Sequence, residues 1–151
     1  MQHSILKNEL EQEVVGQCVC QKVRKAARTV TRAYDEALKP VGIKANQFTM
    51  LSVIALVDDL SLTSLADKIG MERTTLIRNL GPLERDGLVE IYAQPGSRAR
   101  SAKITEQGQY LIKEALPLWR KAQSSLKQYL GDEMWASMQT NLHGLGSAPI
   151  K

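Results

Sequence analysis

Hydrophobic residues recur at helical spacing over most of this 151-residue chain. Between Val14 and about Lys39 they return every three or four positions, while charged residues occupy the opposite face. We therefore expect one long helix there, closed by Pro40. Ala45 or Asn46 is expected to begin the next helix. Its residues are apolar on almost every side, which indicates a helix buried in the core.

The C-terminal part of the chain returns to a helical pattern from Glu106. Pro117 lies inside this pattern and should bend the helix, because proline removes one backbone hydrogen bond. Gly131 interrupts the pattern. Asp132 is expected to cap a last helix over about residues 133–142, since a short polar side chain can accept hydrogen bonds from the first turn.

Two short helices joined by a tight turn are expected between the long helices. The first spans residues 64–69, with Thr63 or Ser64 as its cap. Gly70 ends it, because glycine adopts the left-handed backbone of a helix end. The second spans residues 73–85. One of its faces consists of leucines that should pack inward, namely Leu76, Leu80 and Leu83.

A β-hairpin with a basic tip is expected after the second short helix. Residues 88–92 and 102–104 have strand character, and residues 95–100 form a turn-rich loop with two arginines. Residues 60–62 can add one rung to this hairpin. A mainly α chain with this small β-wing predicts a winged helix-turn-helix. In that fold the second helix can enter the major groove of DNA and the hairpin can reach the minor groove.

Composition narrows the class of protein. The net charge of +4 favours an anionic partner. The sequence has no apolar run of membrane-spanning length and no signal-peptide pattern, so we expect a cytoplasmic protein without a membrane partner. His3 and His143 lie far apart, and neither metal-ligand spacing nor a catalytic motif is present. We therefore expect a protein that is not an enzyme and uses no metal or cofactor.

The outward face of the second short helix carries the residues best suited to read DNA. Arginine can place two donors on a guanine edge, and threonine can bond a base or a phosphate or touch a thymine methyl group. The candidates are Arg73, Thr74, Thr75, Ile77 and Arg78, of which the two arginines are the principal ones. The alternative is a solvated helix face with no nucleic-acid partner.

The hairpin supplies a second set of cations. Arg98 on a thin loop suits the minor groove, whose negative potential deepens where the groove narrows. Arg100 and Lys103 are expected to hold phosphates. The alternative is a flexible basic hairpin without a partner.

The terminal helices carry more large apolar residues than a small domain can bury. We expect one domain, residues 1–151, in which residues 45–105 form the DNA-binding region and residues 146–151 form a loose tail. Residues 1–44 and 106–145 would form the interface of a two-fold dimer, which also matches a palindromic DNA site. The alternative is a monomer whose helices cover the winged region.

These segments together resemble the MarR family of bacterial transcription regulators. Residues 63–70, 73–80, 83–89, 97–98 and 104–108 carry the likeness, which extends through the flanking helices to nearly the whole chain. The resemblance implies a homodimer joined by its terminal helices, usually a repressor. It also implies release from DNA by a small aromatic or lipophilic ligand or by cysteine oxidation. The chain departs from the family at Gly96, where an aspartate commonly braces the wing arginine.

Cys18 and Cys20 leave two interpretations open. Cys20, followed by Arg28 and Tyr34, partly resembles the family's hydroperoxide-sensing subset, although two tyrosines of that subset are missing. The simpler interpretation makes both cysteines small apolar residues in a helix interface. Residues two apart point to different sides of a helix, so we do not expect the two thiols to bond to each other.

The sequence therefore predicts a homodimeric repressor of a pseudo-palindromic operator, released by a small ligand. An apolar crevice between the dimer helices and the winged region would hold that ligand, with Tyr34, Phe48 and Trp119 as its walls. Two alternatives remain: a redox-triggered repressor with Cys20 as the trigger, and a winged helix that docks proteins instead of DNA.

Overall fold

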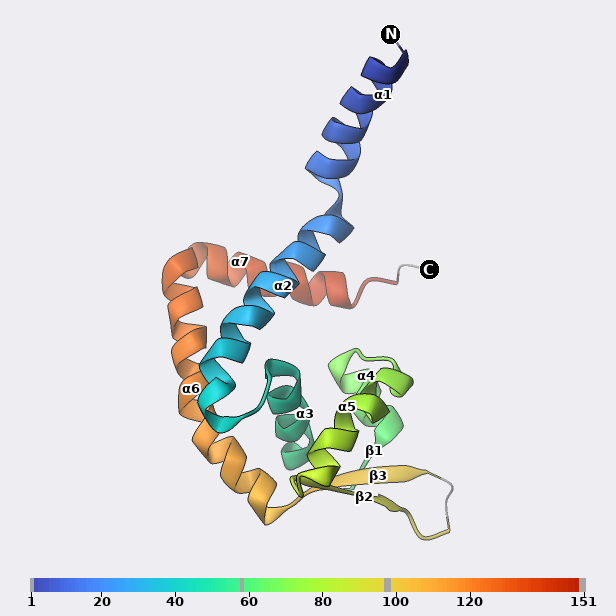
Figure 1. Cartoon of the computed structure of the whole chain (residues 1–151), viewed down its shortest axis with the longest axis vertical. Helices are drawn as coiled ribbons and strands as arrows, with labels where there is room; N and C mark the ends of the chain where they lie inside the picture. Colours follow the sequence, from blue (N-terminus) through green and yellow to red (C-terminus); the bar gives the residue numbers. More distant parts are fainter. Residues whose placement is uncertain (1, 58, 97–98, 150–151) are drawn as a thin grey trace.

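The protein is largely helical, with a small sheet at one end (Figure 1). The computed structural model describes residues 2–57, 59–96 and 99–149. Within these residues the α-helices are α1 (Gln2–Glu9), α2 (Val19–Leu38), α3 (Ala45–Leu56), α4 (Leu62–Ile69), α5 (Arg73–Arg85), α6 (Glu106–Leu130) and α7 (Asp132–Gly146). A π-helical segment η1 (Leu10–Val15) and a 3₁₀ turn η2 (Lys39–Val41) flank α2. The mainly α class with a small β-wing is confirmed.

The three strands form one antiparallel sheet in the order β1–β3–β2. The wing hairpin pairs β2 (Val89–Ala93) with β3 (Arg100–Ile104), and β1 (Leu60–Ser61) adds the expected rung on the other side of β3. At the tip, the Gln94 amide donates to the Ala99 carbonyl (3.2 Å) and Gly96 has a φ of 72°. The hairpin prediction is confirmed. Residues 97 and 98 lie outside the described part of the chain.

The helix-turn-helix is also as expected, apart from its first cap. Gly70 ends α4 with a φ of 66°, in the left-handed region. The predicted caps Thr63 and Ser64 are wrong, because β1 runs directly into α4. The helix therefore begins at Leu62, and the Ser61 hydroxyl accepts the Ser64 amide (3.1 Å).

The core lies where α3, α4, α5 and the sheet meet. Among the large side chains that are fully buried in the described part of the chain, all except Leu38 lie between residues 45 and 105: Met50, Leu51, Ile54, Leu65, Leu76, Leu80, Leu83 and Ser101. The expectation that α3 is buried on almost every side is only partly correct. Its inner face is buried, but Leu56 in its last turn is 83% exposed.

The N-terminal helix is not continuous, contrary to expectation. It breaks at Cys18, whose φ of −59° and ψ of 109° are not helical, and π-helical winding precedes the break. Glycine is a poor helix former and β-branched valine a modest one, so the Val14-Val15-Gly16 run is a weak point. Figure 1 shows the arm formed by α1 and η1 standing away from the body.

The two C-terminal helices differ from expectation at their junction. Helix α6 continues through Pro117 and curves along its length (Figure 1). The predicted cap Asp132 is wrong: Gly131 is the cap residue, and Asp132 begins α7 with its carboxylate 3.1 Å from the Lys127 ammonium. Helix α7 runs to Gly146, beyond the expected end at residue 142.

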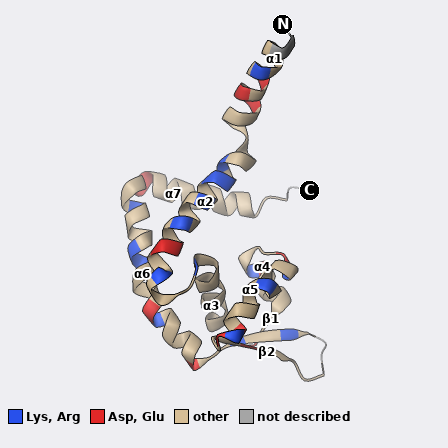
Figure 2. Ribbon diagram, in the orientation of Figure 1, with Lys and Arg blue, Asp and Glu red and all other residues tan. Residues whose placement is uncertain are grey.

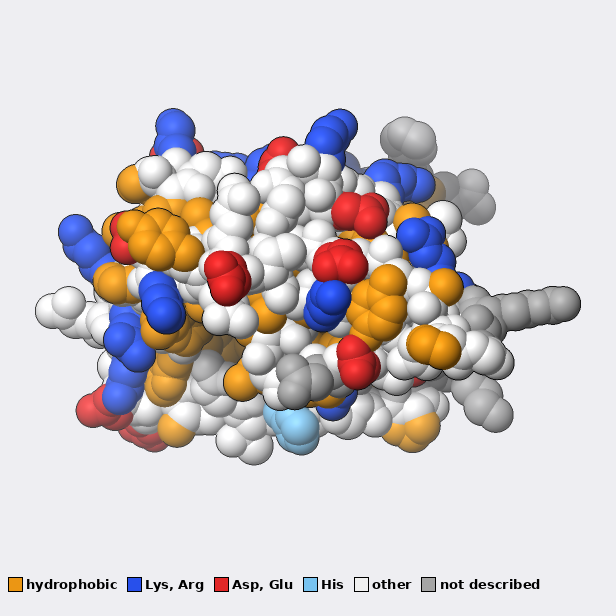
Figure 3. Space-filling view, turned by 90° about the horizontal axis from the view of Figure 1, so that it is seen from below, with side chains coloured by type: hydrophobic (Ala, Val, Ile, Leu, Met, Phe, Trp, Pro, Cys, Tyr) orange, Lys and Arg blue, Asp and Glu red, His pale blue; other side chains and the backbone are white. Residues whose placement is uncertain are grey.

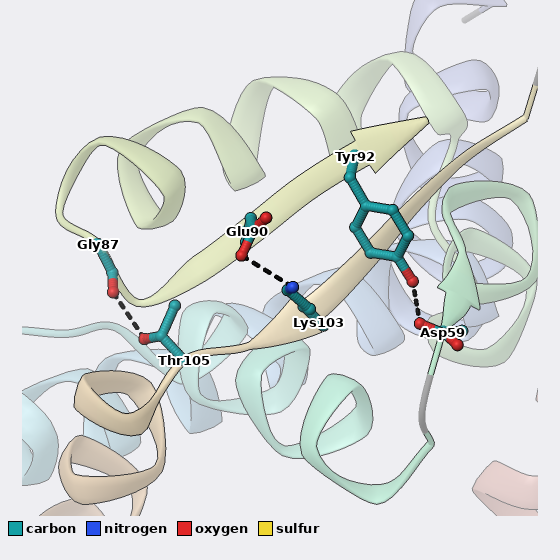
Figure 4. Close-up of polar contacts among 6 residues, drawn as sticks. All are labelled: Asp59, Gly87, Glu90, Tyr92, Lys103 and Thr105. Carbon is teal, nitrogen blue, oxygen red and sulfur yellow. Dashed lines mark hydrogen bonds and ion pairs between the residues drawn. The ribbon is translucent and has the colours of Figure 1, made fainter. Parts of the chain in front are cut away.

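A close junction joins the base of the wing to α6. The Thr105 hydroxyl donates to the Gly87 carbonyl (2.6 Å, Figure 4) and accepts the Gly108 amide (3.0 Å), which caps α6. A Cβ at Gly108 would collide with the Leu88 carbonyl oxygen and press on the Ile104 side chain. Only glycine fits here, so the start of α6 and the wing keep a fixed relation.

Candidate nucleic-acid interface

Helix α5 has one buried face and one exposed face. Its leucines pack inward as predicted, since Leu76, Leu80 and Leu83 are all 0% exposed. The predicted DNA-reading residues are all exposed, on the first turn and the outward side of the same helix: Arg73, Thr74, Thr75, Ile77 and Arg78. The structure thus brings two guanidinium groups, two hydroxyl groups and one apolar side chain onto one surface.

The arginines of this surface are available to an anion. Among the ion pairs between described residues, none involves Arg73 or Arg78. Figure 2 shows basic positions on α5 and on β3 of the wing. A guanidinium group that has no carboxylate partner in the protein can place its donors on a phosphate or a guanine edge without first breaking an ion pair.

The wing divides its cations between two faces. Arg98 lies outside the residues that the structure describes. Arg100 begins β3 and is exposed. Because successive side chains on a strand point to opposite faces, Arg100 and Lys103 lie on different sides of the sheet. The structure does not bring these two cations together.

Lys103 is engaged within the wing. Its ammonium lies 3.0 Å from the Glu90 carboxylate on the paired strand and 5.4 Å from the centre of the Tyr92 ring (Figure 4). In the space-filling view of this end of the molecule, acidic and basic side chains both lie across the middle, and basic side chains also lie towards the edges (Figure 3). This side of the sheet is therefore of mixed charge, not a basic patch.

Tyr92 also ties the wing to the loop before β1, a contact that the sequence did not indicate. Its hydroxyl donates to the Asp59 carboxylate (Figure 4). This hydrogen bond is the largest cause that raises the pKa of Tyr92 above its ordinary value of 10.0, because the carboxylate stabilises the protonated phenol. Asp59 itself has a φ of 55°. The contact links β2 to the segment just before β1, across the central strand β3.

The three aromatic residues predicted to wall a crevice do meet. The ring centres of Tyr34 and Trp119 are 6.3 Å apart, and those of Phe48 and Trp119 are 6.1 Å apart. The Tyr34 hydroxyl donates to the Gln123 side chain, and burial raises the pKa of Tyr34. Phe48 is only 6% exposed, so its ring belongs to the core.

An apolar cavity of about 550 Å³ lies between α2 and α6. Its lining is mostly small or aliphatic and includes one cation: Ala33, Ala37, Pro40, Leu118, Lys121, Ala122, Ser125 and Leu126. None of the three aromatic residues is part of this lining. The cavity between α2 and α6 is therefore separate from the aromatic cluster, to which α2, α6 and α3 each contribute one ring.

The two cysteines are free thiols beside the break in the N-terminal helix. Cys18 is half-buried and immediately precedes α2, whereas Cys20 is exposed in its first turn. The expectation that they diverge as two residues of one helix does not apply, because Cys18 is not helical. Within the described residues, no three His, Cys, Asp or Glu side chains are grouped as a metal site. No described helix combines the length and the apolar character needed to cross a membrane.

The chain matches no protein-family model. It is 39% identical to the M. tuberculosis transcriptional regulator MosR solved in complex with DNA, with a TM-score of 0.80 over 86% of this chain and 94% of MosR. A mutant E. coli MarR complexed with operator DNA is 22% identical, with a TM-score of 0.78 over 91% and 96%. CouR from Rhodococcus jostii RHA1, bound to p-coumaroyl-CoA, is 17% identical, with a TM-score of 0.76 over 92% and 99%.

The comparisons with MarR and CouR show that this chain shares their fold. The identity to MosR extends over nearly all of that chain, and it accompanies the same winged helix-turn-helix between long terminal helices. This chain therefore belongs to the MarR family of transcription regulators.

Proposed function

We propose that this protein is a homodimeric repressor that binds a pseudo-palindromic operator and leaves it when a small ligand binds. The observation that carries the proposal is the exposed face of α5, where Arg73 and Arg78 have no acidic partner among the described residues. The DNA bound by MosR, the relative with 39% identity, supports it.

In this proposal α5 reads the major groove. Arg73 and Arg78 supply donors to guanine edges or phosphates, Thr74 and Thr75 bond phosphates or bases, and Ile77 touches apolar base edges. Arg98 would enter the minor groove from the wing, and Arg100 would hold a phosphate. Lys103 contributes less, because its ammonium is already paired with Glu90.

Two copies are needed to read both half-sites. The terminal helices leave large apolar residues half-exposed, among them Leu10 (49%), Val14 (52%) and Leu142 (51%). A second copy would cover them and set two α5 helices about one helical turn of DNA apart. The same geometry makes the operator a pseudo-palindrome, because each half-site meets the same protein surface.

The release step would act at the contact between α2 and α6. The 550 Å³ cavity there is apolar apart from Lys121 and Ser125, so it suits an aromatic or lipophilic acid. The aromatic cluster of Tyr34, Phe48 and Trp119 lies between the same helices and α3. The structure of CouR with p-coumaroyl-CoA gives one ligand class for a first screen, aromatic acids and their thioesters.

A redox trigger is the second candidate, because the Cys20 thiol is exposed to solvent and so to an oxidant. Cumene hydroperoxide should then release the parent from DNA but not Cys20→Ser, with Cys18→Ser as the matched variant. Equal release of Cys20→Ser and the parent would exclude Cys20 as the trigger.

A protein-docking role is the third candidate, and it requires that Arg98→Ala leave the activity untouched.

The first experiment is a gel shift with the DNA upstream of the protein's own gene at low and moderate salt. The parent should shift this DNA in preference to a scrambled duplex. Arg78→Ala should weaken operator binding by about 1–3 kcal/mol. Lys113→Ala, which removes an exposed cation from α6, is the matched control and should bind as the parent does. Absence of any shift at either salt concentration would contradict the proposal.

A further inference from the structure

Asn79 lies on α5 beside the candidate DNA-contacting residues, and its half-buried side chain is bonded to other parts of the protein at the surface. The amide nitrogen donates to the Thr75 carbonyl (2.8 Å) and lies 3.9 Å from the Met71 sulfur in the turn before α5. The amide oxygen accepts a hydrogen bond from the Asn46 side chain (3.0 Å) in the first turn of α3. These contacts fix the Asn79 amide and join α3 to α5.

The hydrogen bond supplies a restraint that the leucine face of α5 lacks. The row of buried leucines selects which face of α5 points inward, but apolar attraction is non-directional and allows small rotations about that orientation. A hydrogen bond is directional. In addition, Pro82 has no amide hydrogen, so the Arg78 carbonyl loses its helical donor. The contact with Asn46 therefore restrains α5 laterally just before the point where its backbone is weakened.

Helix α3 is in turn fixed to α2. The Asp35 carboxylate of α2 accepts the Ala45 amide (2.7 Å) at the first residue of α3. The Lys44 amide donates to the Gln47 side chain (2.9 Å), which closes the same turn. Figure 1 shows α3 between α2 and α5. The location of Asn46 is thus set from the side of the terminal helices as well as from the core.

We propose that Asn46 is a positioning residue for operator recognition. Through Asn79 it sets the rotation of α5 relative to α2, so that Arg73 and Arg78 meet the base edges in register. The inference rests on the proposed function and deepens it, because it names what aims the recognition helix. Asn46 acts through Asn79 and needs no DNA contact of its own.

The proposal separates two kinds of DNA binding. Attraction to phosphates depends on charge and tolerates a small rotation of α5, whereas contacts to base edges require one geometry. Loss of Asn46 should therefore weaken binding to the operator and leave binding to a scrambled duplex of the same length almost unchanged. A role confined to stability, or a direct phosphate contact, would weaken both duplexes alike.

The test compares Asn46→Ala, Asn79→Ala and the double variant with the parent by fluorescence anisotropy, with thermal unfolding followed in parallel. The duplexes are the upstream region of the protein's own gene and its scrambled version. Each single variant should lose about 3- to 10-fold on the upstream duplex, as expected for one hydrogen bond. The double variant should lose no more than the singles, because both remove the same bond.

The matched control is Thr49→Ala, one turn further along α3. It removes an exposed side-chain hydrogen bond to the Ala45 carbonyl within α3, and it should bind as the parent does. Unchanged operator binding by Asn46→Ala, equal losses on both duplexes, or additive losses in the double variant would each overturn the positioning role and leave the proposed function standing. A parent that fails to prefer the upstream duplex would overturn both.

Discussion

The winged region buries its large apolar side chains, whereas the terminal helices leave many of theirs exposed. Helices α3, α4 and α5 each bury a set of aliphatic side chains, and only Leu38 among the fully buried large residues of the described chain lies outside residues 45–105. The segments η1 and α7 bury none. Large apolar residues from Ile5 to Val23 and from Met134 to Leu145 remain substantially exposed.

The difference separates two sources of stability. The winged region is closed by contacts within one chain, including the fit of Gly108 against Leu88. An isolated helix is marginal in water, because most helical stability in proteins comes from packing an apolar face. The terminal helices have such a face, but one chain leaves it uncovered. A second copy of the same chain is the simplest surface that completes it.

The largest effect should come from the winged core. Leu80→Ala removes a side chain that is 0% exposed, and it should lower the free energy of unfolding by about 2–5 kcal/mol through lost burial and a cavity. Urea unfolding at a fixed protein concentration measures this loss. Leu142→Ala on α7 is the partner measurement, and its effect should depend on protein concentration. Equal, concentration-independent effects at the two sites would remove the distinction between the regions.

The next effect concerns the terminal helices. Leu10→Asp places a charge on the apolar face of η1 and should weaken self-association by roughly 10- to 100-fold, because an interface would have to bury that charge. Sedimentation equilibrium over a dilution series measures the change. Leu56→Asp is the control, since Leu56 is even more exposed but lies on α3. Unchanged association in Leu10→Asp would show that the arm is not part of the interface.

Local sequence signals predicted most of the winged region. The spacing of Leu76, Leu80 and Leu83 identifies the inward face of α5, and Gly70 marks the turn, because each depends only on backbone geometry within a few residues. The exposed positions of Arg73 and Arg78 follow from the same helix. The break at Cys18 was missed, because an apolar period of three to four does not register local π-helical winding.

Contacts between segments distant in sequence could not be predicted. Asp59 and Tyr92, like Asn46 and Asn79, are 33 residues apart and meet only after the helices and the sheet have packed. The pairing of Lys103 with Glu90 depends on the register of the hairpin, which its turn determines. The phosphate contact predicted for Lys103 could therefore not take into account the Glu90 carboxylate that pairs with it.

A smaller effect distinguishes the two cations of the wing. Arg100→Ala should reduce the salt dependence of operator binding by about one phosphate contact. Lys103→Ala should change it less, because Lys103 lies on the other face of the sheet and the Glu90 carboxylate 3.0 Å away offsets its charge. Anisotropy titrations at several salt concentrations give both slopes. A larger change in Lys103→Ala than in Arg100→Ala would reverse the assignment.

The smallest effect is a change in the pKa of Tyr92 in the wing. It can be compared with the pKa of Tyr34 in the terminal helix α2. Tyr92 and Tyr34 both have a raised pKa, but the main cause is the hydrogen bond to Asp59 for Tyr92 and burial for Tyr34. A raised pKa means that the folded protein holds the phenol proton more tightly than the unfolded chain. The stabilising contribution is therefore complete below pH 10, the ordinary value, and is lost as the pH rises through the raised pKa.

Asp59→Asn should lower the pKa of Tyr92 towards its ordinary value and leave that of Tyr34 unchanged. Tyrosinate absorbance, with Tyr92→Phe and Tyr34→Phe to assign each transition, measures both. If Asp59→Asn moved the Tyr34 transition as well, the wing and the terminal helices would be coupled more closely than their separate packing implies.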